Sequence, residues 1–308
     1  MVTVILNFFL TPQDFLLYNL SRTYSNEIYC KLKKDGLTVA LIVIFALIQG
    51  VTEFIPISSQ GHLIFFNDFF NVSQSSTISI LQMNIIAHMG SLLAVVFYYR
   101  NTVIYWIRSM NMWVRPDLDR KSFLLLNIIV SSTPVFVIGY FFAKYFNYDN
   151  ELLLLIISLT SIIFGILIYI FDKFCLRIKN LGSLTYTLSF YIGLSQCLAL
   201  IPGVSRSGSI ITSMRLLGFR REFAVEYSNL LSIPVILGAV TYLIMKNDNL
   251  IQFGTFTSSI ALTLLILSFI FSFIFLLLFI KWVQRFSFSV FAIYRVLFGL
   301  TILGYFYM

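Results

Sequence analysis

Long apolar runs alternate with short polar connections along most of this 308-residue chain. Six runs are long enough to cross a membrane, and they lie at about 80–99, 122–143, 151–171, 223–245, 256–280 and 289–308. At a rise of about 1.5 Å per residue, each reaches about 30 Å, the thickness of the hydrocarbon core of a bilayer. The pattern therefore predicts an all-α polytopic membrane protein with six transmembrane helices.

Two further apolar segments, 37–70 and 184–214, are interrupted near the middle by proline and by a cluster of serine and glycine. The first interruption reads PISSQGH and the second reads PGVSRSGS. Non-helical backbone is tolerated at membrane depth only where it lines a cavity or packs on protein. We therefore expect both segments to form re-entrant helical hairpins, each entering and leaving the membrane by one face.

The two hairpins resemble each other in sequence. At an offset of 147 residues, Ser58 matches Ser205 and Gly61 matches Gly208. Three of the predicted spans separate the hairpins, and an odd number places the second hairpin on the opposite face of the membrane. The chain is therefore predicted to be an inverted-topology repeat, with discontinuous helices that meet near the midplane.

The repeat defines the expected domain organisation. Residues 37–308 are assigned to one integral membrane domain, whose repeat halves are about 37–171 and 184–308. Residues 1–36 form an N-terminal extension. Its apolar run at 4–20 contains a proline and an aspartate, so we expect an interfacial amphipathic helix, with an extra span as the alternative.

Composition excludes several classes of protein. Of all residues, 59% are hydrophobic, 17% are aromatic and 11% are charged, and the mean hydropathy is +0.90. Soluble domains carry roughly 25% charged residues. A cytosolic enzyme, a disordered chain and a secreted disulfide scaffold are therefore excluded, and an integral membrane protein is indicated.

The basic residues predict the orientation in the membrane. The net charge is +8, and thirteen Lys and Arg residues lie in the connections at 100–121, 173–179, 215–221 and 281–285. The opposite connections hold two, Lys144 and Lys246. By the positive-inside rule the thirteen are cytoplasmic, and basic residues in this setting meet lipid head groups instead of nucleic acid. The C-terminus is then extracytoplasmic.

The first hairpin carries a set of residues suited to chemistry. Gln49 and Glu53 are four residues apart, so they share one helix face and offer the oxygen ligands that a hard cation prefers. Ser58, Ser59 and His62 follow directly, and they offer hydroxyls and an imidazole for nucleophilic attack and proton transfer.

The second hairpin carries the complementary chemistry. Ser205, Arg206, Ser207 and Ser209 lie where a half-helix is expected to begin. The backbone N–H groups of a helix N-terminus and a fork-shaped guanidinium together form a cradle for an anion. Opposite a carboxylate, this combination suits a phosphate or diphosphate bridged by a metal.

The residues of both hairpins also have purely structural interpretations. The Gln49–Glu53 pair could be an interhelical hydrogen-bond pair, and the serine-rich stretch could be a packing turn with Arg206 paired to a carboxylate. For His88, in the run 80–99, we favour a buried hydrogen-bonding group over a catalytic role. A purely structural membrane subunit, however, does not explain two ionisable groups such as Glu53 and Arg206 inside apolar hairpins.

At these residues the chain resembles a known family. The stretch QGVTEFIPISSQGH (49–62) is similar to the (E/Q)xxxE and PxSSxGH signature of the undecaprenyl-diphosphate phosphatases of the bacitracin-resistance type. PGVSRSGSI resembles their PGxSRSxxT motif, and AVEYSNLLSIP (224–234) resembles the segment that follows it. The resemblance covers about 37–308. One departure is Ile210, where the family usually has Thr, and Ile210 is therefore left out of the expected site.

The resemblance implies a membrane hydrolase that converts undecaprenyl diphosphate to undecaprenyl phosphate and inorganic phosphate, and so recycles the lipid carrier of cell-wall glycans. It places the protein in the plasma membrane, with a polyprenyl diphosphate lipid as substrate, membrane lipids as neighbours and no nucleic acid partner. The alternative is a flippase or transporter of a phosphorylated polyprenyl lipid, because inverted repeats with broken helices are also the plan of transporters.

The resemblance also implies roles for single residues. Gln49 and Glu53 would hold a divalent cation, Mg²⁺ or Ca²⁺. The expected catalytic residues are Glu53, Ser59, His62 and Arg206, and the expected substrate-binding residues are Ser58, Gly203, Ser205, Ser207 and Gly208. Either Ser59 or His62 could attack phosphorus, and we favour Ser59 as nucleophile with His62 as its base.

Overall fold

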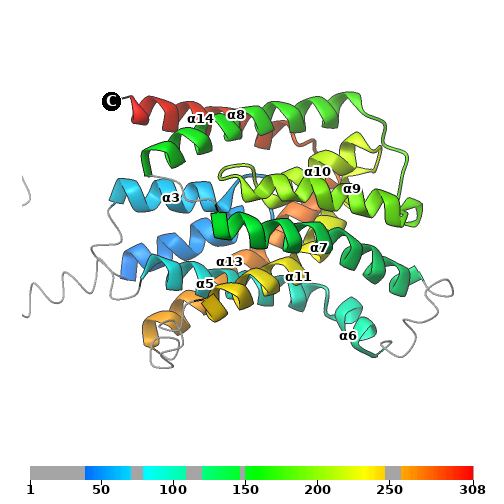
Figure 1. Ribbon diagram of the computed structural model, residues 1–308, viewed down its shortest axis with the longest axis horizontal. Helices are drawn as coiled ribbons and strands as arrows, with labels where there is room; N and C mark the ends of the chain where they lie inside the picture. Colours follow the sequence, from blue (N-terminus) through cyan, green and yellow to red (C-terminus); the bar gives the residue numbers. More distant parts are fainter. Residues whose placement is uncertain (1–38, 71–78, 109–119, 146–149, 247–257, 308) are drawn as a thin grey trace, which may run out of the picture. The chain divides into compact units, whose positions relative to one another are not determined.

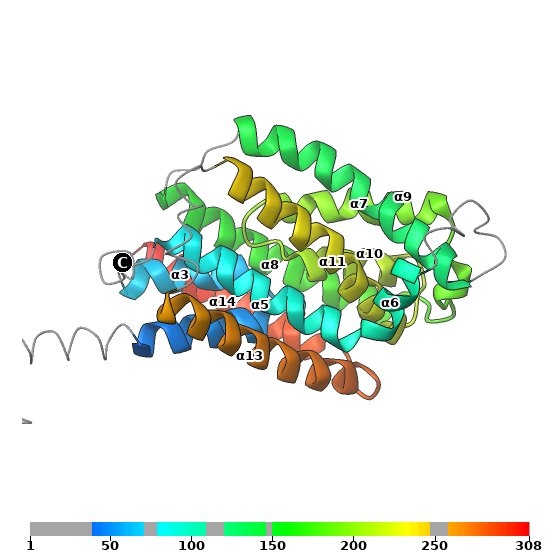
Figure 2. The ribbon, with the colours of Figure 1, turned by 90° about the horizontal axis from the view of Figure 1, so that it is seen from below.

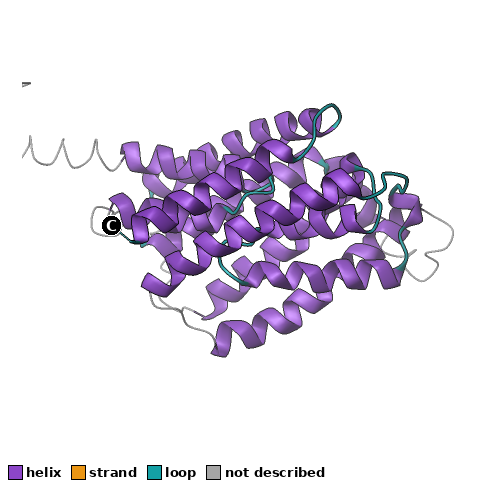
Figure 3. Ribbon diagram, turned by 90° about the horizontal axis from the view of Figure 1, so that it is seen from above, coloured by secondary structure: helices purple, strands orange, loops and turns teal. Residues whose placement is uncertain are grey.

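The structure is a computed structural model that describes residues 39–70, 79–108, 120–145, 150–246 and 258–307. The predicted N-terminal extension, 1–36, lies outside these described residues. The chain divides into two compact units, Met1–Ile42 and Val43–Met308. Every regular element in the described residues is a helix (Figure 3), and all the elements discussed below lie in the second unit, apart from the first turn of the helix Val39–Thr52.

The six predicted membrane spans are present as helices (Figure 1). They are α5 (Ile80–Tyr98), α7 (Arg120–Tyr145), α8 (Asn150–Phe174), α11 (Arg221–Lys246), α13 (Ser259–Val283) and α14 (Ser289–Phe306). A short helix, α6 (Arg100–Arg108), follows α5. Each of the six is long and apolar enough to cross a membrane, so the prediction of an all-α protein with six spans is confirmed.

The outward faces of these helices are apolar. Ile163 on α8, Leu278 on α13 and Leu297 on α14 are each more than half exposed in the isolated chain. A soluble protein rarely exposes large contiguous apolar patches. Such faces are expected where lipid is the solvent, and the chain is therefore a multi-pass membrane protein.

The two interrupted segments form helical hairpins. In the first, the helix Val39–Thr52 is followed by a turn and by α3 (Ser59–Phe70); in the second, α9 (Tyr186–Gln196) and a 3₁₀ turn, η5 (Cys197–Leu200), are followed by α10 (Arg206–Leu216). The 12 residues of α3 reach about 18 Å, well short of a bilayer. That each hairpin enters and leaves by one membrane face stays a prediction.

Both hairpins begin their second helix in the same way. Ser58 precedes α3, and its hydroxyl accepts a hydrogen bond from the backbone N–H of Gly61 at 3.1 Å. Ser205 precedes α10, and its hydroxyl accepts from the N–H of Gly208, also at 3.1 Å. A serine that caps a helix accepts a bond from one of the first free N–H groups. The SxxG match between the two hairpins is therefore a repeated helix start.

The spans pack in pairs that are distant in sequence. α8 lies beside α14, and α5 lies beside α13 (Figures 1 and 2). Small polar residues allow the close approach: the hydroxyls of Ser91 on α5 and Ser272 on α13 are 2.8 Å apart. The helices follow the same order in both halves, a hairpin and then three spans. The division into inverted repeats at 37–171 and 184–308 stays a prediction.

A buried ion cluster joins four elements where α8 ends. The carboxylate of Asp172 accepts hydrogen bonds from Arg215 of α10 at 3.0 Å and from Arg221 of α11 at 2.7 Å. It also accepts from the backbone N–H of Phe288, just before α14, at 3.1 Å. The remaining donors of Arg215 bond to backbone carbonyls near the ends of α8 and α10. The cluster fixes these helix ends relative to one another.

Candidate active site

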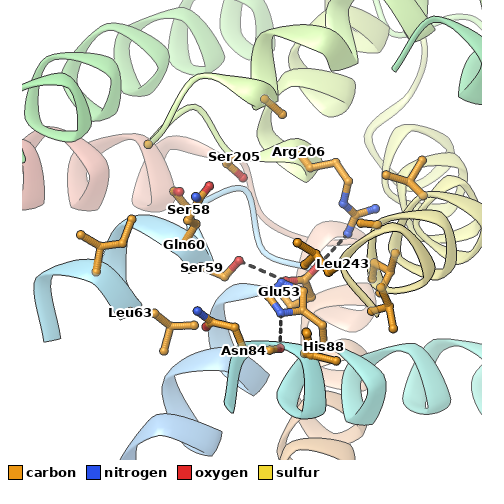
Figure 4. Close-up of a pocket in the computed structure, with 18 of the residues that line it drawn as sticks. Glu53, Ser58, Ser59, Gln60, Leu63, Asn84, His88, Ser205, Arg206 and Leu243 are labelled. Carbon is orange, nitrogen blue, oxygen red and sulfur yellow. Dashed lines mark hydrogen bonds and ion pairs between the residues drawn. The ribbon is translucent and has the colours of Figure 1, made fainter. Parts of the chain in front are cut away.

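A cavity of about 470 Å³ lies where the two hairpin turns meet α3, α5 and α11 (Figure 4). Its polar wall carries residues from both hairpins and from α5: Glu53, Ser58, Ser59, Gln60, Asn84, His88, Ser205 and Arg206. The rest of the wall is apolar and comes mainly from α5 and α11, for example Ile85 and Leu243. The volume is within the range of small-molecule sites.

Glu53 is the centre of the polar wall. It lies in the turn that ends the helix Val39–Thr52, and it is 7% exposed. Its Oε1 accepts a hydrogen bond from Arg206 Nη2 at 3.0 Å. Its Oε2 accepts from Ser59 Oγ at 3.0 Å and from Gln49 Nε2 at 2.9 Å. A buried carboxylate is retained only with such partners, and here they come from both hairpins.

Arg206 brings the opposite charge from the second hairpin. It is the first residue of α10, and Figure 4 shows its guanidinium reaching Glu53 from the side opposite to Ser59. Its other terminal nitrogen, Nη1, is buried and has no hydrogen-bond partner within the described residues. A buried, unpaired donor of a charged group is costly. Arg206 lines the cavity, and its guanidinium, with one terminal nitrogen unpaired, is therefore suited to an anionic ligand.

Ser59 lies in the same cavity wall as Arg206. It is the first residue of α3, so its hydroxyl lies at a helix N-terminus, where free N–H groups favour negative charge. The hydroxyl donates its hydrogen bond to Glu53, so a proton acceptor is already in contact. Ser58, one residue earlier, lines the cavity while its hydroxyl caps α3.

The turn of the second hairpin is strained and tightly packed. Gly203 has φ of 86° and Ser205 has φ of 72°, a region that favours glycine. A Cβ on Gly203 would lie 2.8 Å from the Cα of Ile157, so no larger residue fits there. Both residues line the cavity. Backbone strain of this kind is concentrated at functional sites.

Two expected substrate-binding residues lie behind the cavity wall instead of in it. Ser207 donates its hydroxyl to the backbone carbonyl of Ile55, at 2.8 Å, and so joins the two hairpin turns. Gly208 packs against the guanidinium of Arg295, where a Cβ would lie 2.9 Å from Nη1. Both support the positions of the residues that line the cavity.

His62 differs from the sequence expectation. It does not line the cavity and it is not the partner of the Ser59 hydroxyl, which bonds to Glu53. One ring nitrogen, Nε2, bonds to the hydroxyl of Tyr294 at 2.7 Å, and the ring stacks on Phe298 with centroids 3.9 Å apart. Tyr294 and Phe298 of α14 therefore hold the ring of His62 outside the set of residues that line the cavity.

Arg295 of α14 was not among the residues expected in the site. It is 2% exposed, and its Nη1 donates to the carbonyls of Pro56 and Val204, in the turns of the two hairpins, at 3.2 and 3.0 Å. Its Nη2 donates to the carbonyl of Gly203 at 2.9 Å. One planar guanidinium therefore holds both turns. In the sequence, the one sign of this role was that Arg295 is a charged residue inside the apolar run 289–308.

His88 was expected to be a hydrogen-bonding group and was not placed in the expected site. It lies on α5 one helical turn after Asn84, and both residues line the cavity (Figure 4). The expected hydrogen bond is present, from Nδ1 to the Asn84 carbonyl at 2.7 Å, but the ring also reaches to 3.5 Å from Glu53 Oε2. Polar residues four apart in an apolar span were the signal in the sequence.

The residues expected to hold a cation are close together. Gln49 is fully buried behind Glu53, and its Oε1 has no hydrogen-bond partner in the part of the chain that the structure describes. Amide and carboxylate oxygens suit Mg²⁺ or Ca²⁺. The described residues contain no group of three or more His, Cys, Asp or Glu side chains that could hold a metal ion. A cation here would therefore need ligand atoms from substrate or water.

Comparison with known proteins adds an independent finding. A family model described as "Bacitracin resistance protein BacA" matches residues 42–301. A protein of Alteromonas mediterranea, named undecaprenyl-diphosphatase, is 36% identical over 277 residues, which are 87% of this chain and 99% of that protein. Proteins of the same name from Pelagibacter ubique and Aliivibrio salmonicida are each 35% identical, over 85% and 84% of this chain and 95% of each relative.

Proposed function

This chain belongs to the bacitracin resistance protein BacA family, and we propose that it hydrolyses undecaprenyl diphosphate to undecaprenyl phosphate and inorganic phosphate. The proposed activity is the one in the name of its relatives, undecaprenyl-diphosphatase. The observation that carries it to this chain is the contact of Ser59 and Arg206 with the two oxygens of Glu53, at 3.0 Å each, in one cavity wall. The product would return the lipid carrier to cell-wall glycan synthesis.

Arg206 binds and neutralises the diphosphate. Its unpaired Nη1 donates to a phosphate oxygen, and the N-termini of α3 and α10, next to Ser58 and Ser205, add backbone N–H groups at the same place. In a dry site such donors stabilise the charge that develops on the phosphoryl oxygens as it transfers.

Ser59 and Glu53 carry out the transfer. The Ser59 Oγ attacks the terminal phosphorus, and its proton passes to Glu53 Oε2, with which it already shares a hydrogen bond. The bond from that phosphorus to the bridging oxygen breaks, and undecaprenyl phosphate leaves. Water then attacks the phosphoserine, and inorganic phosphate is released. In this scheme Glu53 takes the role of base that the sequence suggested for His62.

Gln49 and Glu53 would hold a divalent cation, Mg²⁺ or Ca²⁺. The Gln49 amide supports this assignment, because its nitrogen bonds to the Glu53 carboxylate while its buried Oε1 has no partner in the described residues. When bound, such an ion supplies positive charge that offsets the charge of the phosphate oxygens.

The apolar wall of the cavity accepts the start of the prenyl chain. Leu81 and Ile85 of α5 face Ile236, Val240 and Leu243 of α11 across it. A cavity of about 470 Å³ holds the head group and the first part of the chain, and the remainder extends into lipid.

The cavity opens toward the extracytoplasmic side in the orientation that the basic connections favour. It lies between the start of α5 and the end of α11, both of which are extracytoplasmic in that orientation. The C-terminus lies on the same side. In intact cells, an impermeant thiol reagent should label a single cysteine at position 308 and not one at position 110; the reverse pattern would contradict the orientation.

Phosphate release by purified protein tests the proposed function. In detergent, where no transport is possible, the protein should release phosphate from undecaprenyl diphosphate, and a chelator should reduce the rate. Arg206→Ala should lose about 10²–10³ in turnover, since it removes a charge-stabilising donor. Arg220→Ala, at an exposed surface ion pair with Glu222, is the matched control and should keep the rate. A folded wild-type protein that releases no phosphate would leave the flippase alternative in place.

A further inference from the structure

Asn84 is a polar side chain in the cavity wall that the proposed reaction does not use. It lies on α5, a span that is largely apolar. Its backbone carbonyl accepts a hydrogen bond from His88 Nδ1 at 2.7 Å, but its side-chain amide has no hydrogen-bond partner among the residues that the structure describes. An amide inside an apolar span is costly unless it is bonded. The Asn84 amide is therefore available to a ligand in the cavity.

The proposed substrate needs two different parts of this cavity. Its terminal phosphate must lie at Ser59 and Arg206, which attack and neutralise it in the proposed reaction. Its prenyl chain must lie against the apolar wall, which includes Leu81 and Ile85 of α5. The second phosphate, which stays on the lipid, joins these two ends of the molecule. It must therefore lie between Ser59 and the apolar wall.

Asn84 occupies this junction. Leu81 lies three residues before it and Ile85 one residue after it on the same helix, so Asn84 is a polar position within the apolar wall. In the view of Figure 4, Asn84 lies on one side of Ser59, and Arg206 lies on the other. A diphosphate at Ser59 would therefore have a charged donor on one side and a neutral donor on the other.

We propose that the Asn84 amide binds the phosphate that remains on the lipid, which makes Asn84 a specificity-determining residue for a lipid-linked phosphate. The order of the two phosphates in the cavity rests on the proposed function. The side-chain nitrogen of Asn84 donates a hydrogen bond to an oxygen of the retained phosphate.

The chemistry of an amide suits this phosphate. When the bond to the bridging oxygen breaks, its electron pair stays on the lipid phosphate, and an N–H donor stabilises the charge that develops there. The same phosphate must then leave with the product. A neutral donor binds it less tightly than a guanidinium would, because charge-assisted hydrogen bonds are roughly twice as strong as neutral ones.

Asn84→Leu separates this role from a role in folding. Leucine has nearly the shape of asparagine, and it is apolar like most of α5, so the span should fold. The hydrogen bond from His88 goes to the backbone carbonyl of Asn84, so the substitution does not remove it. Asn101→Leu, at an exposed position on α6, is the matched control.

The test measures binding and not turnover. Purified full-length protein in detergent is titrated with undecaprenyl phosphate, which carries only the retained phosphate, and with inorganic phosphate, which corresponds to the terminal one. Asn84→Leu should weaken binding of undecaprenyl phosphate about 10- to 100-fold, the usual loss for a hydrogen bond to a charged group, and leave inorganic phosphate nearly unchanged. Arg206→Ala should weaken inorganic phosphate more than undecaprenyl phosphate. Asn101→Leu should bind both ligands like the wild type.

Undecaprenol, which has the prenyl chain and no phosphate, shows whether the loss is specific to the phosphate. Its affinity should be the same in the wild type and in Asn84→Leu. An equal loss for undecaprenol and undecaprenyl phosphate would assign Asn84 to the prenyl chain and contradict the proposal.

Three further results would overturn the proposal. They are an unchanged affinity of folded Asn84→Leu for undecaprenyl phosphate, equal losses for undecaprenyl phosphate and inorganic phosphate, and a folded wild-type protein that binds no undecaprenyl phosphate. Phosphate release by the wild type with an unchanged lipid affinity in Asn84→Leu would refute the contact and leave the hydrolase intact. The expected losses of affinity without any phosphate release would refute the hydrolase and leave the contact.

Discussion

The protein contains two buried ion clusters, around Asp172 and around Glu53, which differ in how fully their donors are bonded. Around Asp172, the carboxylate is bonded to Arg215, Arg221 and a backbone N–H, and the other donors of Arg215 reach backbone carbonyls. Around Glu53, Arg206 keeps a buried Nη1 that has no partner in the described residues, and the cluster faces a cavity. Arg215, whose donors are bonded, stabilises the fold. Arg206, which lines a cavity and has an unbonded nitrogen, indicates a site for a ligand.

The largest expected effect is a loss of activity when the cluster around Glu53 is changed. Glu53→Gln removes the negative charge of the cavity cluster but keeps the side chain's shape and an acceptor for Arg206. Turnover per folded molecule should fall by about 10²–10³, the usual loss for a key electrostatic contact. The thermal unfolding temperature in detergent should stay close to that of the wild type. Wild-type turnover in folded Glu53→Gln would contradict the assignment of this cluster to the reaction.

The second prediction is a loss of stability when the cluster around Asp172 is changed. Arg215→Met removes a fully buried cation and leaves Asp172 with fewer partners. Breaking a buried ion pair in this way costs about 3–5 kcal/mol. The variant should unfold at a clearly lower temperature, while the molecules that remain folded keep near-wild-type KM. Arg220→Met, at an exposed ion pair, is the control and should leave the unfolding temperature unchanged.

The third prediction concerns the residue that joins the turns of both hairpins. Arg295→Lys keeps the charge but replaces a planar fork with a point donor, so the carbonyls of Pro56, Gly203 and Val204 can no longer all be bonded. The kcat per folded molecule should fall about tenfold with little change in KM, because the catalytic groups shift while the cavity stays. A variant that loses stability but keeps its kcat would show that Arg295 is structural alone.

The sequence predicted the parts of this molecule that depend on local pattern. Span length, the interruptions at proline and the SxxG helix starts follow from neighbours along the chain, and they are present as expected. The direction of His62 does not follow, because it depends on how α3 packs against Tyr294 and Phe298, more than 230 positions away in the sequence. The contacts of Arg295 with both hairpin turns and of His88 with Glu53 also join residues that are distant in the sequence, so local pattern does not predict them.

Identification of the residue that accepts the phosphoryl group tests the account most directly. The protein is quenched during turnover with undecaprenyl diphosphate labelled in its terminal phosphate, and the labelled peptide is isolated. Because the Ser59 hydroxyl bonds to Glu53 and His62 packs on α14, we expect a phosphoserine at Ser59, stable to acid and labile to base. A peptide with acid-labile phosphate on His62, or near-wild-type turnover in Ser59→Ala, would contradict the account.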